Sequence, residues 1–156
     1  SWIVPVLPRL DQRRGDPGAL LPRFDLSAAW DGDRNRPPGD TRLSVAICPG
    51  NPAAGAVTQY VGAGGVGADA PAPPPTPGEP SPRAGCFRYD TPLSLTYIPD
   101  GQSETAMLAE VSVDVGPWPR GGPATVRTFD DAEAAPRPVG VGGQFGGNHP
   151  GGGNVL

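Results

Sequence analysis

The stretch TAMLAEVSVDV, residues 105–115, decides the fold, because it predicts a long strand at the centre of the protein. Alternate positions carry apolar side chains that share one face of an extended chain: Met107, Ala109, Val111, Val113 and Val115. Glu110, Ser112 and Asp114 fall on the opposite face. This pattern predicts a strand with one buried and one wet face, as in an antiparallel sheet that is covered on one side.

Three shorter stretches on either side of this strand also have strand character. Residues 42–48, RLSVAIC, alternate and then stop at a Pro-Gly pair. Residues 57–62, VTQYVG, predict a second short strand, and residues 124–129, ATVRTF, predict an edge strand. We therefore expect one β-dominated, loop-rich α+β head domain over residues 1–156, built on an antiparallel sheet.

The opening residues favour helix only briefly. Apolar side chains recur at helical spacing from Trp2 to Leu10, but Pro5 and Pro8 each remove a helix donor. We expect a short irregular helix or a pair of turns here. Residues 24–40 predict a loop that is anchored by Phe24 and Trp30.

The composition indicates a folded domain with one poorly ordered insertion. The chain has 24 glycines and 23 prolines, about three residues in ten, which is close to the range of disordered proteins. Its ten aromatic residues are spread along the chain, however, and can anchor a core. Seven prolines fall within residues 71–82, so we expect residues 71–85 to form an extended or disordered insertion.

Charge and motifs exclude several classes of function. The net charge is −4 with no basic patch, so no nucleic-acid partner is expected. Residues 62–67, GAGGVG, lack the Lys-Ser/Thr ending of a phosphate loop, and crowding or flexibility of the backbone explains these glycines better. His149 is the only histidine and lies in a glycine-rich turn, which is a poor support for a general base. We expect no enzyme activity and no cofactor.

Metal binding is weakly indicated. A zinc site needs three or four ligands, and two cysteines and one histidine with no C-x-x-C spacing do not predict one. Asp31 and Asp33 begin like a calcium loop, but Arg36 and Arg42 occupy the positions at which an EF-hand has Gly and Glu. Another type of calcium loop through the two aspartates stays a candidate beside the plain reading, a solvated acidic loop.

Two further sets of residues leave alternatives open. Cys48 and Cys86 form either a disulfide, in an oxidising compartment, or two unpaired thiols. Trp30, Tyr97 and Trp118 either stack on sugar rings or anchor the core and loops.

The order of short motifs adds a resemblance to a family. The motifs are SWIVPVLPRLDQ, FDLSAAWDGDRN, SVAICPGNP, TQYVGAGGVGADAP, YIPDGQSETAMLAEV, GPWPRGGPATV and FGGNHPGGGNVL. In this order they resemble a large bacterial family of unknown function, expanded in planctomycetes, which also carries a solute-binding label. Its members have a prepilin-type N-terminal cleavage/methylation helix and a C-terminal signature of His, nine residues, then Asp-Gly. The positions that match the family are Asp100, Gly101, Ser103, Thr105, Glu110, His149, Pro150 and Gly151.

The resemblance implies that the sequence is the middle of a longer protein. The family's apolar helix would precede Ser1, and the signature aspartate would follow three positions after Leu156. The implied function is a non-enzymatic, pseudopilin-like head on a membrane-anchored protein of the cell envelope, with a periplasmic or extracellular location. Its partners would be other pilin-like subunits or secretion machinery. The alternative is an extracellular carbohydrate- or solute-binding module with a glycan as its ligand. Glu104 stands where the family has an amide, which puts any inherited hydrogen bond there in doubt.

Overall fold

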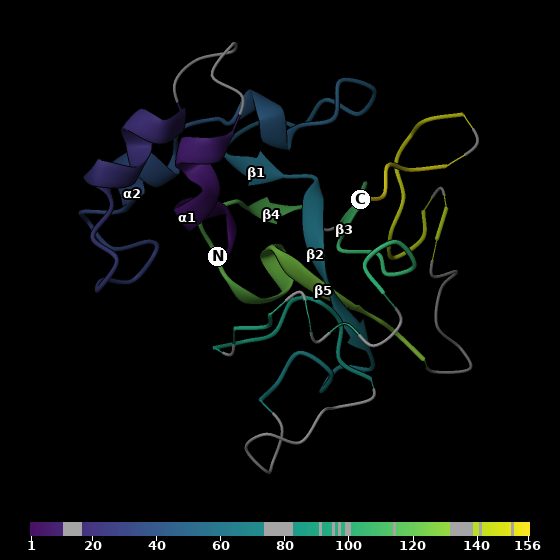
Figure 1. The fold of residues 1–156 in the computed structure, drawn as a ribbon. Coiled ribbons are helices and arrows are strands. Elements are labelled where there is room, and N and C mark those ends of the chain that lie inside the picture. Colours follow the sequence, from purple (N-terminus) through teal and green to yellow (C-terminus); the bar gives the residue numbers. More distant parts are fainter. Residues whose placement is uncertain are drawn as a thin grey trace.

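We describe the protein from a computed structural model, shown in Figure 1. The described residues are 1–10, 17–73, 83–90, 92–94, 96, 98, 101–113, 115–131, 139–140, 142–150 and 152–156. Its α-helices are α1 (Ile3–Val6) and α2 (Arg36–Gly39), and its 3₁₀ helices are η1 (Leu7–Arg9), η3 (Pro17–Arg23), η4 (Ser44–Ala46) and η6 (Gly122–Ala124). Its strands are β1 (Val57–Thr58), β2 (Tyr60–Val66), β3 (Leu108–Glu110), β4 (Gly116–Pro117) and β5 (Val126–Phe129).

The strands form two small sheets. β1 and β4 pair antiparallel, and the larger sheet has the order β3-β2-β5. β2 lies antiparallel to β3, with Tyr60 opposite Glu110, and parallel to β5, with Gly62 opposite Val126. The fold is therefore α+β, sheet-dominated and loop-rich, as predicted. The parallel β2–β5 pair makes the larger sheet mixed, whereas an antiparallel sheet was expected.

The first apolar core lies under the N-terminal helices, which Figure 1 shows at the left in purple and blue. Its centre is the fully buried indole of Trp118, whose Nε1 donates to the Thr41 carbonyl at 2.8 Å and whose ring meets Phe24 edge-on. The other buried members come from the helices and their connections: Ile3, Val4, Leu7, Leu20, Leu43 and Ala46. We call this cluster the helical core.

The second apolar core lies on the larger sheet. It consists of Val61 from β2, Ala109 and Val111 from and just after β3, and Phe145 from the C-terminal segment. The rings of Phe145 and Phe129 lie 4.3 Å apart between centroids, and this contact joins the segment to β5. We call this cluster the sheet core.

The N-terminal segment forms the short irregular helix that the sequence predicts. α1 tolerates Pro5 because a proline in the first turn removes no intrahelical hydrogen bond. Ile3 and Val4 are buried, and Trp2 Nε1 donates to the Thr125 carbonyl at 2.7 Å. Among the described residues, no helix combines the length and the apolar character that crossing a bilayer requires.

The prediction of a strand over residues 42–48 is wrong. Its middle forms η4, where the Ala46 amide donates to the Leu43 carbonyl at 3.0 Å. The Cys48 amide then donates to the side-chain oxygen of the buried Gln59 at 2.7 Å. The acceptor for this amide is thus a side chain of another segment rather than the backbone of a neighbouring strand. Alternation alone does not reveal such a partner.

The central strand is shorter than predicted, and Glu110 is buried where the pattern predicted a solvent-exposed side chain. Ala109 and Val111 are buried as expected, but β3 spans only three residues and Glu110 is also buried, at 1% exposure. The cause is the C-terminal segment, which lies along the outer edge of β3 in Figure 1. The Glu110 amide donates to the Asn154 carbonyl, and Leu156 and Leu108 exchange backbone hydrogen bonds.

The glycines of β2 allow a second segment to cross it closely. A Cβ at Gly62 would collide with the Phe87 ring, and one at Gly65 would collide with the backbone at Arg83. Gly65 also has φ +107°, which favours glycine. Of the two predicted explanations, crowding and flexibility, crowding of the backbone accounts for Gly62 and Gly65. Most of the predicted insertion, residues 74–82, lies outside the described residues.

Candidate functional site

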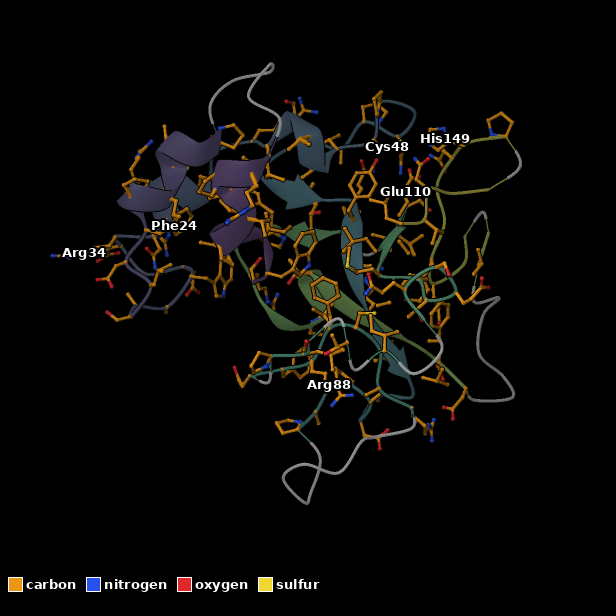
Figure 2. All side chains as sticks on the ribbon, viewed as in Figure 1. Phe24, Arg34, Cys48, Arg88, Glu110 and His149 are labelled. Carbon is orange, nitrogen blue, oxygen red and sulfur yellow. The ribbon has the colours of Figure 1, made fainter. Side chains whose placement is uncertain are left out.

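Three chemically reactive side chains meet at one end of the larger sheet, as Figure 2 shows. Cys48 follows η4, Glu110 ends β3, and His149 lies in the C-terminal glycine-rich turn. Cys48 Sγ lies 3.0 Å from His149 Nε2, and the same nitrogen lies 3.5 Å from Glu110 Oε2. One sulfur, one nitrogen and one carboxylate oxygen thus all lie within 4.8 Å of one another. We call these three residues the Cys-Glu-His cluster.

The thiol of the cluster is held in place, and the imidazole packs against a glycine. Cys48 is fully buried and its amide is held by Gln59, so the sulfur has a defined position. Gly50 faces the His149 ring, and a Cβ built there would lie 3.1 Å from Cε1. His149 remains the accessible member, because its side chain is 40% exposed.

The carboxylate of Glu110 is fully buried, and only one of its two oxygens has hydrogen-bond partners. Oε2 accepts hydrogen bonds from the Asn154 amide and from Asn154 Nδ2, both at 3.0 Å. Oε1 has no hydrogen-bond partner. Gly147 packs its backbone against the carboxylate, and a Cβ there would collide with it. The segment around Gly147 and Asn154 therefore orients Glu110 and shields it from water.

Burial and neighbours shift the two acids of the cluster in opposite directions. Burial by itself would raise the pKa of Glu110, but hydrogen bonds from Cys48 and Asn154, together with the charge of His149, hold that pKa below its ordinary value. Burial raises the pKa of the Cys48 thiol, and the interaction with Glu110 raises it further. At neutral pH the cluster therefore holds a protonated thiol beside an ionised carboxylate.

The geometry does not match a nucleophilic triad. In a triad the nucleophile contacts one ring nitrogen of the histidine while the carboxylate contacts the other. Here Cys48 and Glu110 both face Nε2. Donor atoms that converge on one point are instead the arrangement that holds a metal ion.

The two described aromatic candidates, Trp30 and Trp118, do not share a pocket. Trp118 is fully buried in the helical core, so neither face of its ring is open to a ligand. Trp30 is 37% exposed and lines a depression of about 430 Å³, with the Arg120 guanidinium 6.0 Å from its ring centroid. Tyr97 lies outside the described residues.

The acidic and cysteine candidates are also separate. Asp31 lies beside Trp30, and among the described residues neither Asp31 nor Asp33 joins a group of three potential metal-binding side chains. Cys48 and Cys86 are both free thiols, so the structure shows the unpaired alternative.

The described matching positions Gly101, Ser103 and Thr105 lie in or next to a turn. Gly101 has φ +85°, and Thr105 Oγ1 donates to its carbonyl at 3.0 Å. Ser103 is exposed in the same turn. Pro150 is an exposed turn residue after His149, while Asp100 and Gly151 lie outside the described residues.

Sequence reasoning missed the Cys-Glu-His cluster, because its members are far apart in the chain. The only local signal is that Cys48 and His149 are each followed by Pro-Gly, a turn that can leave a side chain at the end of a segment. Nothing in that pattern brings the two turns together. Their proximity depends on the pairing of the C-terminal segment with β3.

Comparison with known proteins identifies the family. The family model described as "Protein of unknown function (DUF1559)", with the label SBP_bac_10, matches residues 1–137. The chain therefore belongs to this family. The match covers Cys48 and Glu110 and ends before His149. No curated protein and no solved structure matches the chain.

Proposed function

We propose that the domain is the non-enzymatic, pseudopilin-like head of a membrane-anchored protein of the cell envelope, exposed to the periplasm or the exterior. In this arrangement an apolar helix leads into Ser1 and anchors the head in the membrane. Other pilin-like subunits or secretion machinery are its partners. A head of this kind needs a firm mechanical connection between the anchor and its own core.

The position of α1 carries this proposal. Ile3, Val4 and Leu7 are buried in the helical core, so a helix that enters at Ser1 would be held directly by the head. Trp2 precedes α1 and has helical dihedral angles, φ −73° and ψ −19°. A helix can therefore continue backward through Trp2 without a change in its backbone.

An open apolar groove gives further support. It has a volume of about 540 Å³ and lies where the N-terminal and C-terminal segments meet; its walls include Trp2, Ile3, Val45, Leu108, Val155 and Leu156. Val45, Val155 and Leu156 are exposed there. Residues that precede Ser1 enter beside this groove, so an apolar anchor helix is the occupant we propose for it.

The anchor is tested by locating the full-length protein in the cells that make it. We expect it in the membrane fraction, with the head degraded by protease added to intact cells or to cells with a permeabilised outer membrane. Recovery as a protease-protected protein in the soluble fraction would contradict the proposal.

The groove is tested by thiol labelling of Val45→Cys in the 156-residue chain and in the full-length protein. We expect labelling of this position to be slower in the full-length protein, because the helix covers it. Val66→Cys is the matched control, since Val66 is similarly exposed and does not line the groove. Equal labelling of Val45→Cys in both proteins would show that the helix lies elsewhere.

A second candidate function is carbohydrate or solute binding, which the family label also suggests. The specific observation is Trp30, a partly exposed ring beside Asp31 and Asp40 in one depression. An aromatic face next to carboxylates is a combination that can bind a sugar. Glycan-array binding that is lost in Trp30→Ala and kept in Trp30→Phe would support this function. An array with no bound glycan would count against it.

A further inference from the structure

We propose that Cys48, Glu110 and His149 bind a divalent transition metal ion of the zinc class. The ligands are Cys48 Sγ, His149 Nε2 and the Glu110 carboxylate, with a fourth position for water on the exposed side of His149. One thiolate, one imidazole and one carboxylate form a mixed donor set that suits zinc. The site is independent of the proposed role as a membrane-anchored head.

Two of the three distances between donor atoms fit with a small movement, and the third, between Cys48 and Glu110, is within 4.8 Å. Tetrahedral zinc with ordinary bond lengths of about 2.0–2.3 Å separates neighbouring donor atoms by about 3.4–3.6 Å. His149 Nε2 and Glu110 Oε2 already lie 3.5 Å apart. Cys48 Sγ and His149 Nε2 lie 3.0 Å apart, so this pair has to open by about half an ångström. A turn rich in glycine permits such a shift of His149.

The buried carboxylate supplies independent support for a cation. Glu110 has a fully buried side chain, and its Oε1 has no hydrogen-bond partner. A buried acceptor without a partner is costly, and a buried carboxylate needs a compensating charge. The His149 ring contacts Oε2 through the same nitrogen that faces Cys48, and it can offset the carboxylate's charge only in its protonated form. A metal ion between the three residues would compensate the carboxylate directly.

Hydrogen bonds from neighbouring residues hold the ligands in place, as metal sites require. Asn154 donates twice to Glu110 Oε2 and leaves Oε1 free, so it orients the carboxylate. Gln59 fixes the backbone of Cys48. When the metal binds, the Cys48 thiol releases its proton to solvent and the thiolate becomes the ligand. Asn154 and Gln59 are positioning residues, because neither is proposed to touch the metal.

The first experiment titrates the metal-free 156-residue chain with cobalt(II), followed by displacement with zinc. We expect one metal ion per chain and a charge-transfer absorption band from the cobalt–thiolate bond, which zinc abolishes. We also expect zinc to protect Cys48 from alkylation, as mapped by mass spectrometry. This labelling uses the unaltered protein, so it does not depend on whether a variant folds.

The second experiment compares variants by zinc affinity. Cys48→Ser and His149→Gln are each expected to weaken binding by about 100-fold or more, because loss of a residue that only orients a ligand already costs roughly 10–100-fold. Asn154→Ala should weaken binding by about 10-fold and keep the cobalt–thiolate band. Cys86→Ser is the matched control, since Cys86 is the other thiol and lies outside the cluster.

Several results would overturn the site. These are the absence of stoichiometric cobalt binding, a cobalt complex without a thiolate band, and equal loss of affinity in Cys86→Ser. Alkylation of Cys48 that proceeds equally fast with and without zinc would also overturn it. Because no arm of these experiments uses the membrane or the anchor, failure here leaves the proposed head function standing.

Discussion

The helical core and the sheet core differ in how they treat polar groups. The helical core surrounds Trp118 with aliphatic side chains, and the one polar atom of that ring has a backbone partner. The sheet core has four buried apolar residues and lies beside a cluster that buries a thiol and a carboxylate. Apolar burial stabilises a fold, whereas buried ionisable groups cost stability unless they are fully paired.

This contrast divides stability and chemistry between the two regions. The helical core offers no reactive side chain, and the end of the sheet next to the Cys-Glu-His cluster leaves one carboxylate oxygen unpaired. Incompletely satisfied buried groups are concentrated at functional sites in proteins. We therefore expect substitutions in the helical core to affect folding, and substitutions in the cluster to affect metal binding.

The largest effect is expected for Trp118→Ala, which removes the centre of the helical core. Loss of a fully buried Trp costs about 3–5 kcal/mol of unfolding free energy, because a cavity replaces its contacts. Urea unfolding followed by circular dichroism measures the change. Trp30→Ala is the control and should cost under about 1 kcal/mol, since that ring is partly exposed. Similar losses for both tryptophans would contradict a dominant helical core.

The next effect is expected for Glu110→Ala, which leaves the Asn154 donors without their acceptor. We expect a loss of about 1–3 kcal/mol in the metal-free protein. Glu110→Gln should lose less, because its side-chain oxygen still accepts from Asn154. Urea unfolding of both variants without metal separates the packing role of the residue from its proposed ligand role. A Gln variant that is less stable than the Ala variant would contradict this account.

A smaller effect is expected from pH at Cys86, which lies outside both cores. Burial raises the pKa of this thiol above its ordinary value of 9.0. The unfolded chain therefore loses the thiol proton first, and the free energy of unfolding falls as pH rises through the folded pKa. Unfolding at about pH 7 and about pH 10 should show a larger decrease for the natural protein than for Cys86→Ala. Equal decreases would show that Cys86 does not contribute.

The smallest effect is expected for Leu26→Ser, which tests the outer limit of the helical core. Leu26 is 74% exposed, so its replacement should change the unfolding free energy by less than about 0.5 kcal/mol. The same urea experiment measures it. A loss comparable to that of a core residue would mean that Leu26 is covered in solution by a partner or a second copy.

The sequence predicted part of the strand pattern. Residues 57–62, predicted as one strand, form β1 and the first half of β2; residues 124–129 contain β5 at the edge of the larger sheet, and Ala109 and Val111 are buried as their alternation indicated. The strand prediction over residues 42–48 failed because the middle of this stretch forms η4. Gln59, in another segment, binds the Cys48 amide with its side chain and the Ala46 carbonyl with its own amide. Alternation reports which side chains avoid water, but it does not report what supplies the hydrogen bonds.

The candidate site could not be predicted for a related reason. Glu110 belongs to the face that its strand pattern assigns to solvent, and only the C-terminal segment buries it. Cys48 and His149 are 101 residues apart, and no spacing rule for metal ligands connects them. Proximity of this kind depends on the three-dimensional path of loops, which local propensity does not determine.

The edge contact between β3 and the C-terminal segment also sets an order of events during synthesis. Leu108 and Glu110 obtain backbone partners from Leu156 and Asn154, which leave the ribosome after every other described part of the sheet. All residues of the helical core have been synthesised once Trp118 has left the ribosome. A nascent chain can therefore complete its helical core while Glu110 is still open to water, and the sheet closes as a late, separate step.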